Sequence, residues 1–153
     1  MSFKNLVSVG FIAIALSFVS SFASAQDGWI IKDSANSVSV TADKLVAIIE
    51  KAPPKLFARV DHSAGAKNAG LELPAATMVM FGVPAIGTPI MQENLMAGID
   101  LPIRVLIWDD KGQTKIGYLA ADALAKRYSI SGAEKALKQM AGALDKFTSG
   151  AAK

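Results

Sequence analysis

The 153-residue chain contains no cysteine and only one histidine, His62. Disulfide bonds, thiol chemistry and cysteine-ligated metal sites are therefore excluded, and the fold must be held together by packing. The same absence excludes a lipid anchor on an N-terminal cysteine. The chain also lacks the G-x-x-x-x-G-K-[ST], G-x-S-x-G and C-x-x-C-H patterns, which are the usual sequence signals of nucleotide binding, hydrolase chemistry and attached haem.

Net charge is small. Sixteen lysines and arginines stand against 13 aspartates and glutamates, for a net charge of +3. Loss of Lys4 with the N-terminal segment described next would lower the net charge from +3 to +2. Such a balance gives little general attraction for nucleic acid or anionic lipid, and we expect no nucleic-acid partner.

The N-terminus has the pattern of an export signal. Lys4 precedes the uncharged apolar run Leu6–Val19, and Ala23-Ser24-Ala25 is a small-x-small cleavage site. The run is shorter than the roughly 20 residues of a permanent membrane helix. We predict that residues 1–25 are a cleaved signal peptide, with an uncleaved anchor as the alternative. The mature protein would then be periplasmic or secreted, without stable membrane insertion.

Residues 26–148 are predicted to form one domain, with residues 149–153 as a disordered tail. A first strand is expected at Gly28–Ser34, which Val38 and Val40 extend. A helix is expected from Thr41 or Ala42, with Thr41 as its N-cap, to the proline pair that begins at Pro53.

Alternating or continuous apolar residues predict further strands at Leu56–His62, Met78–Val83, Ile103–Trp108 and Thr114–Leu119. Two helices are expected after these strands, one at Ala121–Tyr128 and a last one capped by Ser131 and Glu134. Asp109–Gly112 is a predicted hairpin turn. Met78–Val83 is apolar on both sides, which indicates a central strand covered on both faces by helices, with a partner subunit as an additional cover. This order favours an α+β fold with a largely antiparallel sheet.

The stretch Thr77–Trp108 carries the most distinctive pattern, FG-x-P-x-x-GTP-x-M followed by GIDLP. It resembles the core motif of the DUF302 family, a family without a known function, and the resemblance extends over Ser39–Ser129. It implies a compact α+β domain with a curved, mostly antiparallel sheet packed by helices, similar to TBP-like folds. It also implies a homodimer.

Position by position, the resemblance points to a candidate ligand-binding set, in which Thr88 belongs to the GTP segment: His62, Gly82, Pro84, Gly87, Thr88, Met91, Leu101, Pro102 and Tyr118. The chain departs from the common motif at two positions. Val83 stands where the family typically has Asn, and Ala85 where it typically has Lys. The loop at 82–89 is therefore less polar, and we interpret it as the stiff wall of a small-molecule cleft.

His62 has two interpretations. It is either an imidazole that ligates a metal or shuttles a proton, or a structural residue that pins the corner between a strand and a helix. A copper site would combine it with thioethers from Met78, Met80, Met91 and Met96, and a haem site would use His62 and one methionine. Methionine is also an ordinary filler of cores. No metal ligand is assigned, and His62 and Met91 are only weak candidates.

Three charged residues near the motif have structural interpretations. Asp100 is expected to form a turn by bonding backbone amides, and Arg59 and Arg104 are expected to pair with acids. No catalytic residue and no cofactor are predicted. The sequence favours an exported binding or accessory protein, whose partner is a small ligand or an envelope protein, over an enzyme. The alternatives are a copper- or haem-binding redox protein and a purely structural homodimerisation module.

Overall fold

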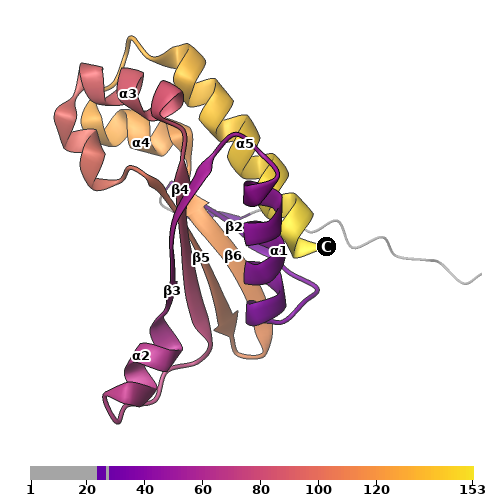
Figure 1. The fold of residues 1–153 in the computed structure, drawn as a ribbon. Helices are drawn as coiled ribbons and strands as arrows, with labels where there is room; N and C mark the ends of the chain where they lie inside the picture. The colour runs from indigo at the N-terminus through magenta and orange to yellow at the C-terminus, as the bar shows by residue number, and fades with distance from the viewer. Residues whose placement is uncertain (1–23, 27) are drawn as a thin grey trace, which may run out of the picture.

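The computed structural model describes residues 24–26 and 28–153 (Figure 1). Its strands form one six-stranded sheet in the order β1-β2-β6-β5-β4-β3, and all neighbours are antiparallel. The strands are β1 Ser24–Gln26, β2 Trp29–Asp33, β3 Lys55–Asp61, β4 Ala76–Gly82, β5 Ile103–Asp110 and β6 Gln113–Leu119. The helices are α1 Val38–Glu50, α2 His62–Asn68, α3 Pro84–Glu93, the 3₁₀ helix η1 Leu95–Ile99, α4 Ala121–Tyr128 and α5 Glu134–Ala152.

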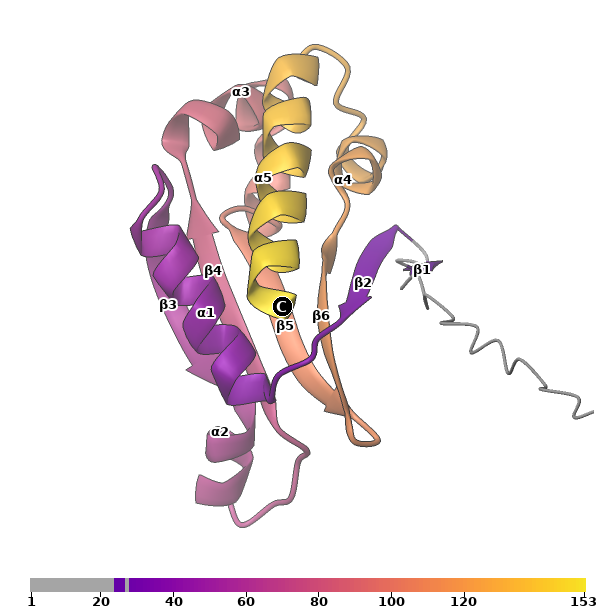
Figure 2. The same cartoon turned by 90° about the vertical axis from the view of Figure 1, so that its right-hand side faces the viewer.

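Helices cover one face of the sheet. α1 and α5 lie side by side across it, α3 and α4 gather at one end, and α2 projects from the other end (Figures 1 and 2). Alternate residues of β4, β5 and β6 face α1 and α5 and are buried. The predicted α+β fold with an antiparallel sheet packed by helices is confirmed.

None of the helices formed by residues 28–153 covers the opposite face of the sheet. Met78 and Met80 of β4 point to it and are half-buried, whereas Val79 and Phe81 on the inner face are buried. The prediction of helices on both faces of this strand was therefore wrong, because β4 lies next to the edge strand β3 in a two-layer fold.

Local sequence signals located two elements well. α4 has the predicted bounds. The hairpin between β5 and β6 turns at Lys111 and Gly112, which have φ values of 54° and 92°. Positive φ at both central residues is the two-residue turn whose twist matches that of the paired strands, and Gly112 adopts it without a steric cost.

Helix α1 begins earlier than predicted. Its N-cap is Ser37, whose hydroxyl accepts a hydrogen bond from Val40 N at 3.4 Å, so Val38 belongs to the helix and does not extend the first strand. Thr41 is buried inside the helix, where its hydroxyl lies 2.7 Å from that of Ser34. Serine and threonine are both good N-caps, so residue type does not distinguish Ser37 from Thr41. Burial of Val38 favours the helix that begins after Ser37. The last helix, in contrast, begins later than predicted, at Glu134, and lacks the predicted Ser131 cap.

The predicted loop at 82–89 is largely helix α3. Pro84 occupies the first turn, where a missing N–H costs nothing, and Pro89 lies inside the helix. Ile90 is fully buried, and α3 packs on α5. Burial of this apolar face stabilises the helix despite one lost backbone hydrogen bond.

The predicted tail at 149–153 is also helical. α5 continues to Ala152, and Ala151 is fully buried. Ala35 N donates to Ala152 O at 2.9 Å. Lys32 Nζ donates to Asp145 Oδ1 at 2.7 Å, to Thr148 Oγ1 at 2.9 Å and to Ser149 Oγ at 2.8 Å. The last turn does not fray because β2 holds it through contacts distant in sequence.

We expect Lys32→Met to lower the free energy of unfolding by about 1–2 kcal/mol, because the Lys32 side chain is 15% exposed and makes several charge-assisted hydrogen bonds. Amide hydrogen exchange in residues 148–152 should accelerate as well. The control is Lys115→Met, which removes one partly exposed pair with Asp33 at 2.5 Å and should cost under about 1 kcal/mol. Equal effects of the two substitutions would contradict the proposed anchoring role of Lys32.

Residues 1–23 of the predicted signal peptide lie outside the described residues. The predicted cleavage position after Ala25 falls within β1, which pairs with β2. Cleavage there stays a prediction. None of the helices in the described part of the chain has the length and apolar character that a membrane crossing requires.

Candidate functional site

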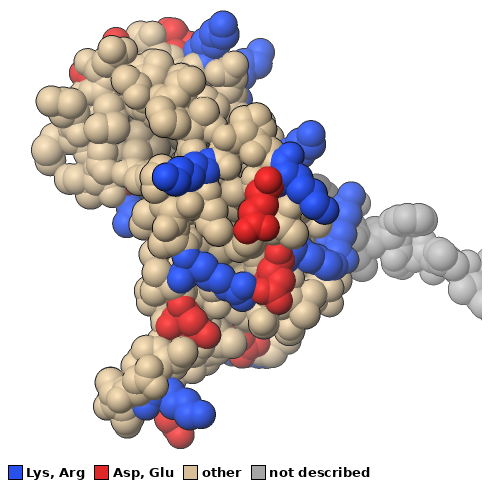
Figure 3. Space-filling view, in the orientation of Figure 1, with Lys and Arg blue, Asp and Glu red and all other residues tan. Residues whose placement is uncertain are grey.

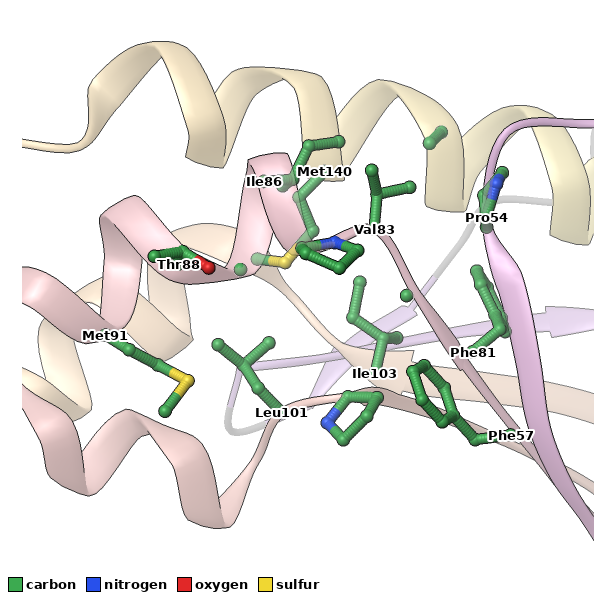
Figure 4. A pocket seen from close by; sticks show the side chains of 15 residues that line it. Pro54, Phe57, Phe81, Val83, Ile86, Thr88, Met91, Leu101, Ile103 and Met140 are labelled. Carbon is green, nitrogen blue, oxygen red and sulfur yellow. The ribbon is translucent and has the colours of Figure 1, made fainter.

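An apolar pocket of about 210 Å³ lies at the end of the sheet, beside α3 and α5. α3 and the middle of α5 form one side of it. The ends of β3 and β4 and the segment that leads into β5 form the other (Figure 4).

Seven residues of the predicted ligand-binding set line this pocket: Gly82, Pro84, Gly87, Thr88, Met91, Leu101 and Pro102. The structure thus brings both halves of the motif, which are separated by η1 in the sequence, to one cavity. That a ligand binds there stays a prediction.

The helical conformation of α3 is what aligns the first half of the motif. Pro84, Gly87, Thr88 and Met91 follow the spacing i, i+3, i+4 and i+7, so they share one face of the helix, and all four line the pocket. This spacing was visible in the sequence. The prolines and glycines of this stretch are typical of loops, and they predict a loop where the helix forms.

The other lining residues were not in the predicted set: Pro54, Phe57, Phe81, Val83, Ile86, Ile103, Met140 and Ala143. Met140 was recognisable only as part of the apolar stripe of the last helix. Phe57 lies at the irregularity in the β3–β4 register, between Leu56 and Ala58, which the regular alternation of a strand does not predict.

The lining is almost entirely carbon. Thr88 is the one residue with a hydroxyl, amide or charged side chain among the 15 that line the pocket. Val83, which stands where the resemblance leads one to expect Asn, contributes an isopropyl group to the wall. The pocket therefore suits an apolar group and offers almost nothing to an anion.

A charged cluster holds the pocket wall in place from outside. Asp100 immediately precedes Leu101, and its side chain is 9% exposed. Its carboxylate accepts hydrogen bonds from Arg104, from Arg127 Nη1 at 2.7 Å and from the Tyr128 hydroxyl at 2.8 Å. The expected pairing of Arg104 is confirmed, whereas the expected bonding of Asp100 to backbone amides was wrong, because α4 brings stronger donors to it.

Burial alone would raise the pKa of Asp100. The hydrogen bonds from Tyr128 and Arg127 and the charges of Arg127 and Arg104 outweigh burial, so the pKa of this carboxyl lies below its ordinary value. The ionised cluster links the segment before β5 to the C-terminal turn of α4.

His62 does not reach the pocket. It is the first residue of α2, at the opposite end of the sheet from α3, and it is exposed (Figure 1). The corner between β3 and α2 is pinned by its neighbour Asp61, whose carboxylate accepts from Ser63 Oγ at 2.6 Å and Ala64 N at 2.9 Å. These hydrogen bonds lower the pKa of Asp61.

Tyr118 is also outside the pocket. It lies on the inner face of β6, is 1% exposed, and has Lys32 Nζ 5.8 Å from its ring centre. Burial raises the pKa of its hydroxyl above the ordinary value. Tyr118 is thus part of the core beneath the anchor of α5.

The structure does not bring together His62 and Met91, the two weak candidates for a metal site. His62 begins α2 and Met91 lies in α3, at opposite ends of the sheet (Figure 1). Within the described residues, histidine, aspartate and glutamate form no group of three that would hold a metal ion.

Comparison with known proteins identifies the family and the fold of the chain. The family model for "Domain of unknown function DUF302" matches residues 30–147. The crystal structure of an uncharacterised conserved DUF302 protein from Bacillus stearothermophilus is similar in fold, with a TM-score of 0.65 and 18% identity. The match covers 82% of this chain and 95% of that one.

Curated relatives are similar over part of their length. The chain is 38% identical over 131 residues to "Fluoride-specific ion channel FluC 1" of Brucella suis biovar 1, covering 82% of this chain and 51% of that protein. The corresponding channel proteins of Brucella abortus and Brucella melitensis are also 38% identical, with 48% of each covered. The chain thus spans about half the length of these relatives. Because the family model matches most of its residues, the chain belongs to the DUF302 family.

Proposed function

We propose that the protein binds the apolar part of a small molecule in the pocket between α3 and the ends of β3 and β4. The observation that carries this proposal is the lining itself, in which Thr88 supplies the one polar side chain. A concave apolar site with one hydroxyl suits a hydrocarbon or aromatic group, oriented by a single hydrogen bond.

The rim of the pocket is stiff. Pro54, Pro84 and Pro102 stand around it, each with a backbone φ restricted by its ring. The charged cluster at Asp100 fixes the segment that carries Leu101 and Pro102. A pocket held open in this way loses little conformational entropy when a ligand enters.

The direct test is titration with N-phenyl-1-naphthylamine, a neutral aromatic fluorophore whose emission rises in apolar surroundings. We expect saturable binding of one probe per chain. The probe should be displaced by medium-chain fatty acids and unaffected by inorganic anions, because the lining offers no cation. Binding that fails to saturate, or that anions displace, would contradict the proposal.

A role close to a membrane is favoured by the curated relatives. Proteins named as fluoride-specific ion channels contain a region 38% identical to this chain, and an ion channel works within a membrane. We propose that this chain, exported as its N-terminal pattern suggests, acts as an accessory module beside an envelope membrane protein. Co-purification with a membrane transport protein after crosslinking in the producing cell is the test, and recovery of the chain alone would count against it.

We also propose that the uncovered face of the sheet pairs with a second copy, as the family resemblance leads us to expect. Val60 and Leu106 are exposed on this face and pair with the half-buried Met78 from the two neighbouring strands, Arg104 pairs with Met80, and Trp29 is exposed on the same face of β2. A sheet face with several exposed apolar side chains beside a polar one is typical of subunit interfaces.

We expect Leu106→Glu to convert a dimer to a monomer in analytical ultracentrifugation, because the added charge would be buried at the centre of the interface. The matched control is Leu73→Glu, which places the same charge on an exposed leucine of the segment after α2. A wild-type monomer at micromolar concentration, or a dimer unchanged by Leu106→Glu, would contradict this use of the face.

A further inference from the structure

The segment η1, between α3 and the second half of the motif, exposes large apolar side chains. Leu95 is 78% exposed, Met96 60% and Ile99 64%. Together they form an apolar tip, defined here as Leu95, Met96 and Ile99. In Figure 3 the lobe built by α3 and its neighbours is almost free of charged side chains, which lie at its edges.

Several backbone N–H groups in and around η1 are already hydrogen-bonded. Met96 N donates to Asn94 Oδ1 at 2.9 Å, Ala97 N to Asn94 O at 3.0 Å, and Asp100 N to Ala97 O at 3.1 Å. The segment 94–99 carries no ionisable side chain. Both properties are required of a segment that enters lipid, where water is not available to satisfy backbone groups.

Two cations lie beside the C-terminal end of η1. Arg104 and Arg127 are exposed, and both reach the carboxylate of Asp100 directly after η1. Asp100 is largely buried and offsets one of the two charges, so this end of η1 carries a net positive charge, while Glu93 lies exposed at the other end. Although the net charge of the whole chain is small, a local group of cations is attracted to anionic headgroups, by about 1 kcal/mol per residue.

The apolar tip is joined to the pocket. A Cβ built on Gly98 would lie 3.1 Å from Met91 Cε, so η1 packs against the methionine that lines one end of the cavity. Leu101, which follows η1, lines the same end (Figure 4). A lipid surface in contact with the apolar tip would therefore lie next to this end of the pocket.

We propose that the apolar tip inserts shallowly into an anionic lipid bilayer and that the pocket takes up an alkyl or acyl chain from that bilayer. The inference rests on the proposed binding function of the pocket and adds the class of ligand and its source. The apolar side chains enter the acyl boundary, the cations at Arg104 and Arg127 meet the headgroups, and the hydrocarbon chain passes along Met91 into the cavity.

The test is flotation of the processed chain with vesicles of phosphatidylethanolamine and phosphatidylglycerol in a 3:1 ratio. We expect the variant Leu95→Asp/Met96→Asp/Ile99→Asp to reduce the vesicle-bound fraction by about ten-fold or more. The matched control is Leu71→Asp/Leu73→Asp, because these leucines are 66% and 48% exposed at the opposite end of the molecule. The control should bind vesicles as the wild type does.

Titration with N-phenyl-1-naphthylamine in the absence of vesicles separates the two proposals. The apolar-tip variant should bind the probe with unchanged affinity, yet extract it from preloaded vesicles at least about ten-fold more slowly. Failure of the wild type to float, or equal loss in the control variant, would overturn the membrane inference. If the wild type does not bind the probe in solution, the proposed function of the pocket is overturned, even where the protein binds vesicles.

Discussion

Gly87→Leu is expected to weaken binding of N-phenyl-1-naphthylamine by about ten-fold or more and to leave the protein folded. Gly87 lies on the face of α3 that lines the pocket, and a Cβ at this position would meet only Leu101 Cδ1, at 4.0 Å. The added side chain would occupy the space that the ligand needs. Loss of burial equivalent to two methylene groups of ligand corresponds to about 1.6 kcal/mol, or roughly ten-fold in affinity.

The fold should tolerate this substitution because leucine favours a helix over glycine by up to about 1 kcal/mol. The matched control is Gly65→Leu in α2, where a Cβ would meet nothing within 4 Å and which lies at the opposite end of the sheet. Fluorescence titration gives the affinity, and thermal unfolding confirms the fold. Unchanged probe binding in Gly87→Leu would contradict the assignment of the pocket.

The same variant separates binding from a purely structural role of the motif. If the motif served only to build a dimer, Gly87→Leu would change the sedimentation coefficient. Under the binding proposal the oligomeric state is kept and only probe binding is lost. The proposed dimer face, around Leu106, lies on the uncovered side of the sheet and does not include the pocket.

Asp100→Ala is expected to lower the free energy of unfolding at pH 7 by about 2 kcal/mol. The carboxylate accepts hydrogen bonds from three donors, two of them charged. The loss is smaller than that of breaking a fully buried pair because the side chains of Arg104 and Arg127 are both more than 40% exposed and can be solvated again. Urea unfolding measures the change.

The effect should depend on pH in one direction. Because the folded pKa of Asp100 lies below its ordinary value of 3.8, the stabilisation is present above about pH 3.8 and is lost as pH falls through the folded pKa. The difference between wild type and Asp100→Ala should therefore be constant from pH 7 to pH 5 and shrink below pH 3.8. A difference that grows on acidification would contradict the ionised cluster. Tyr128→Phe, which removes one neutral donor, should show the same trend at a smaller amplitude.

Much of the fold could be read from local patterns. The helix at Ala121–Tyr128 and the turn at Lys111-Gly112 depend on capping, periodicity and turn chemistry within a few residues. The motif also identified seven of the 15 residues that line the pocket. The prediction from the motif was wrong at His62 and Tyr118, which lie at the start of α2 and in the core. Nothing in the spacing of the motif distinguishes such structural positions from pocket positions.

The sequence by itself determined the absence of thiol chemistry, the α+β class, the family motif and the apolar character of the residues around it. Only the tertiary structure decided that 84–93 is a helix, that the chain is ordered to Ala152, and that Asp100 is ionised among arginines. The reason is the same in each case. Burial of Ile90, the contacts of Lys32 with α5 and the approach of α4 to Asp100 join residues far apart in the chain, and their free energies outweigh the local preferences that a sequence displays.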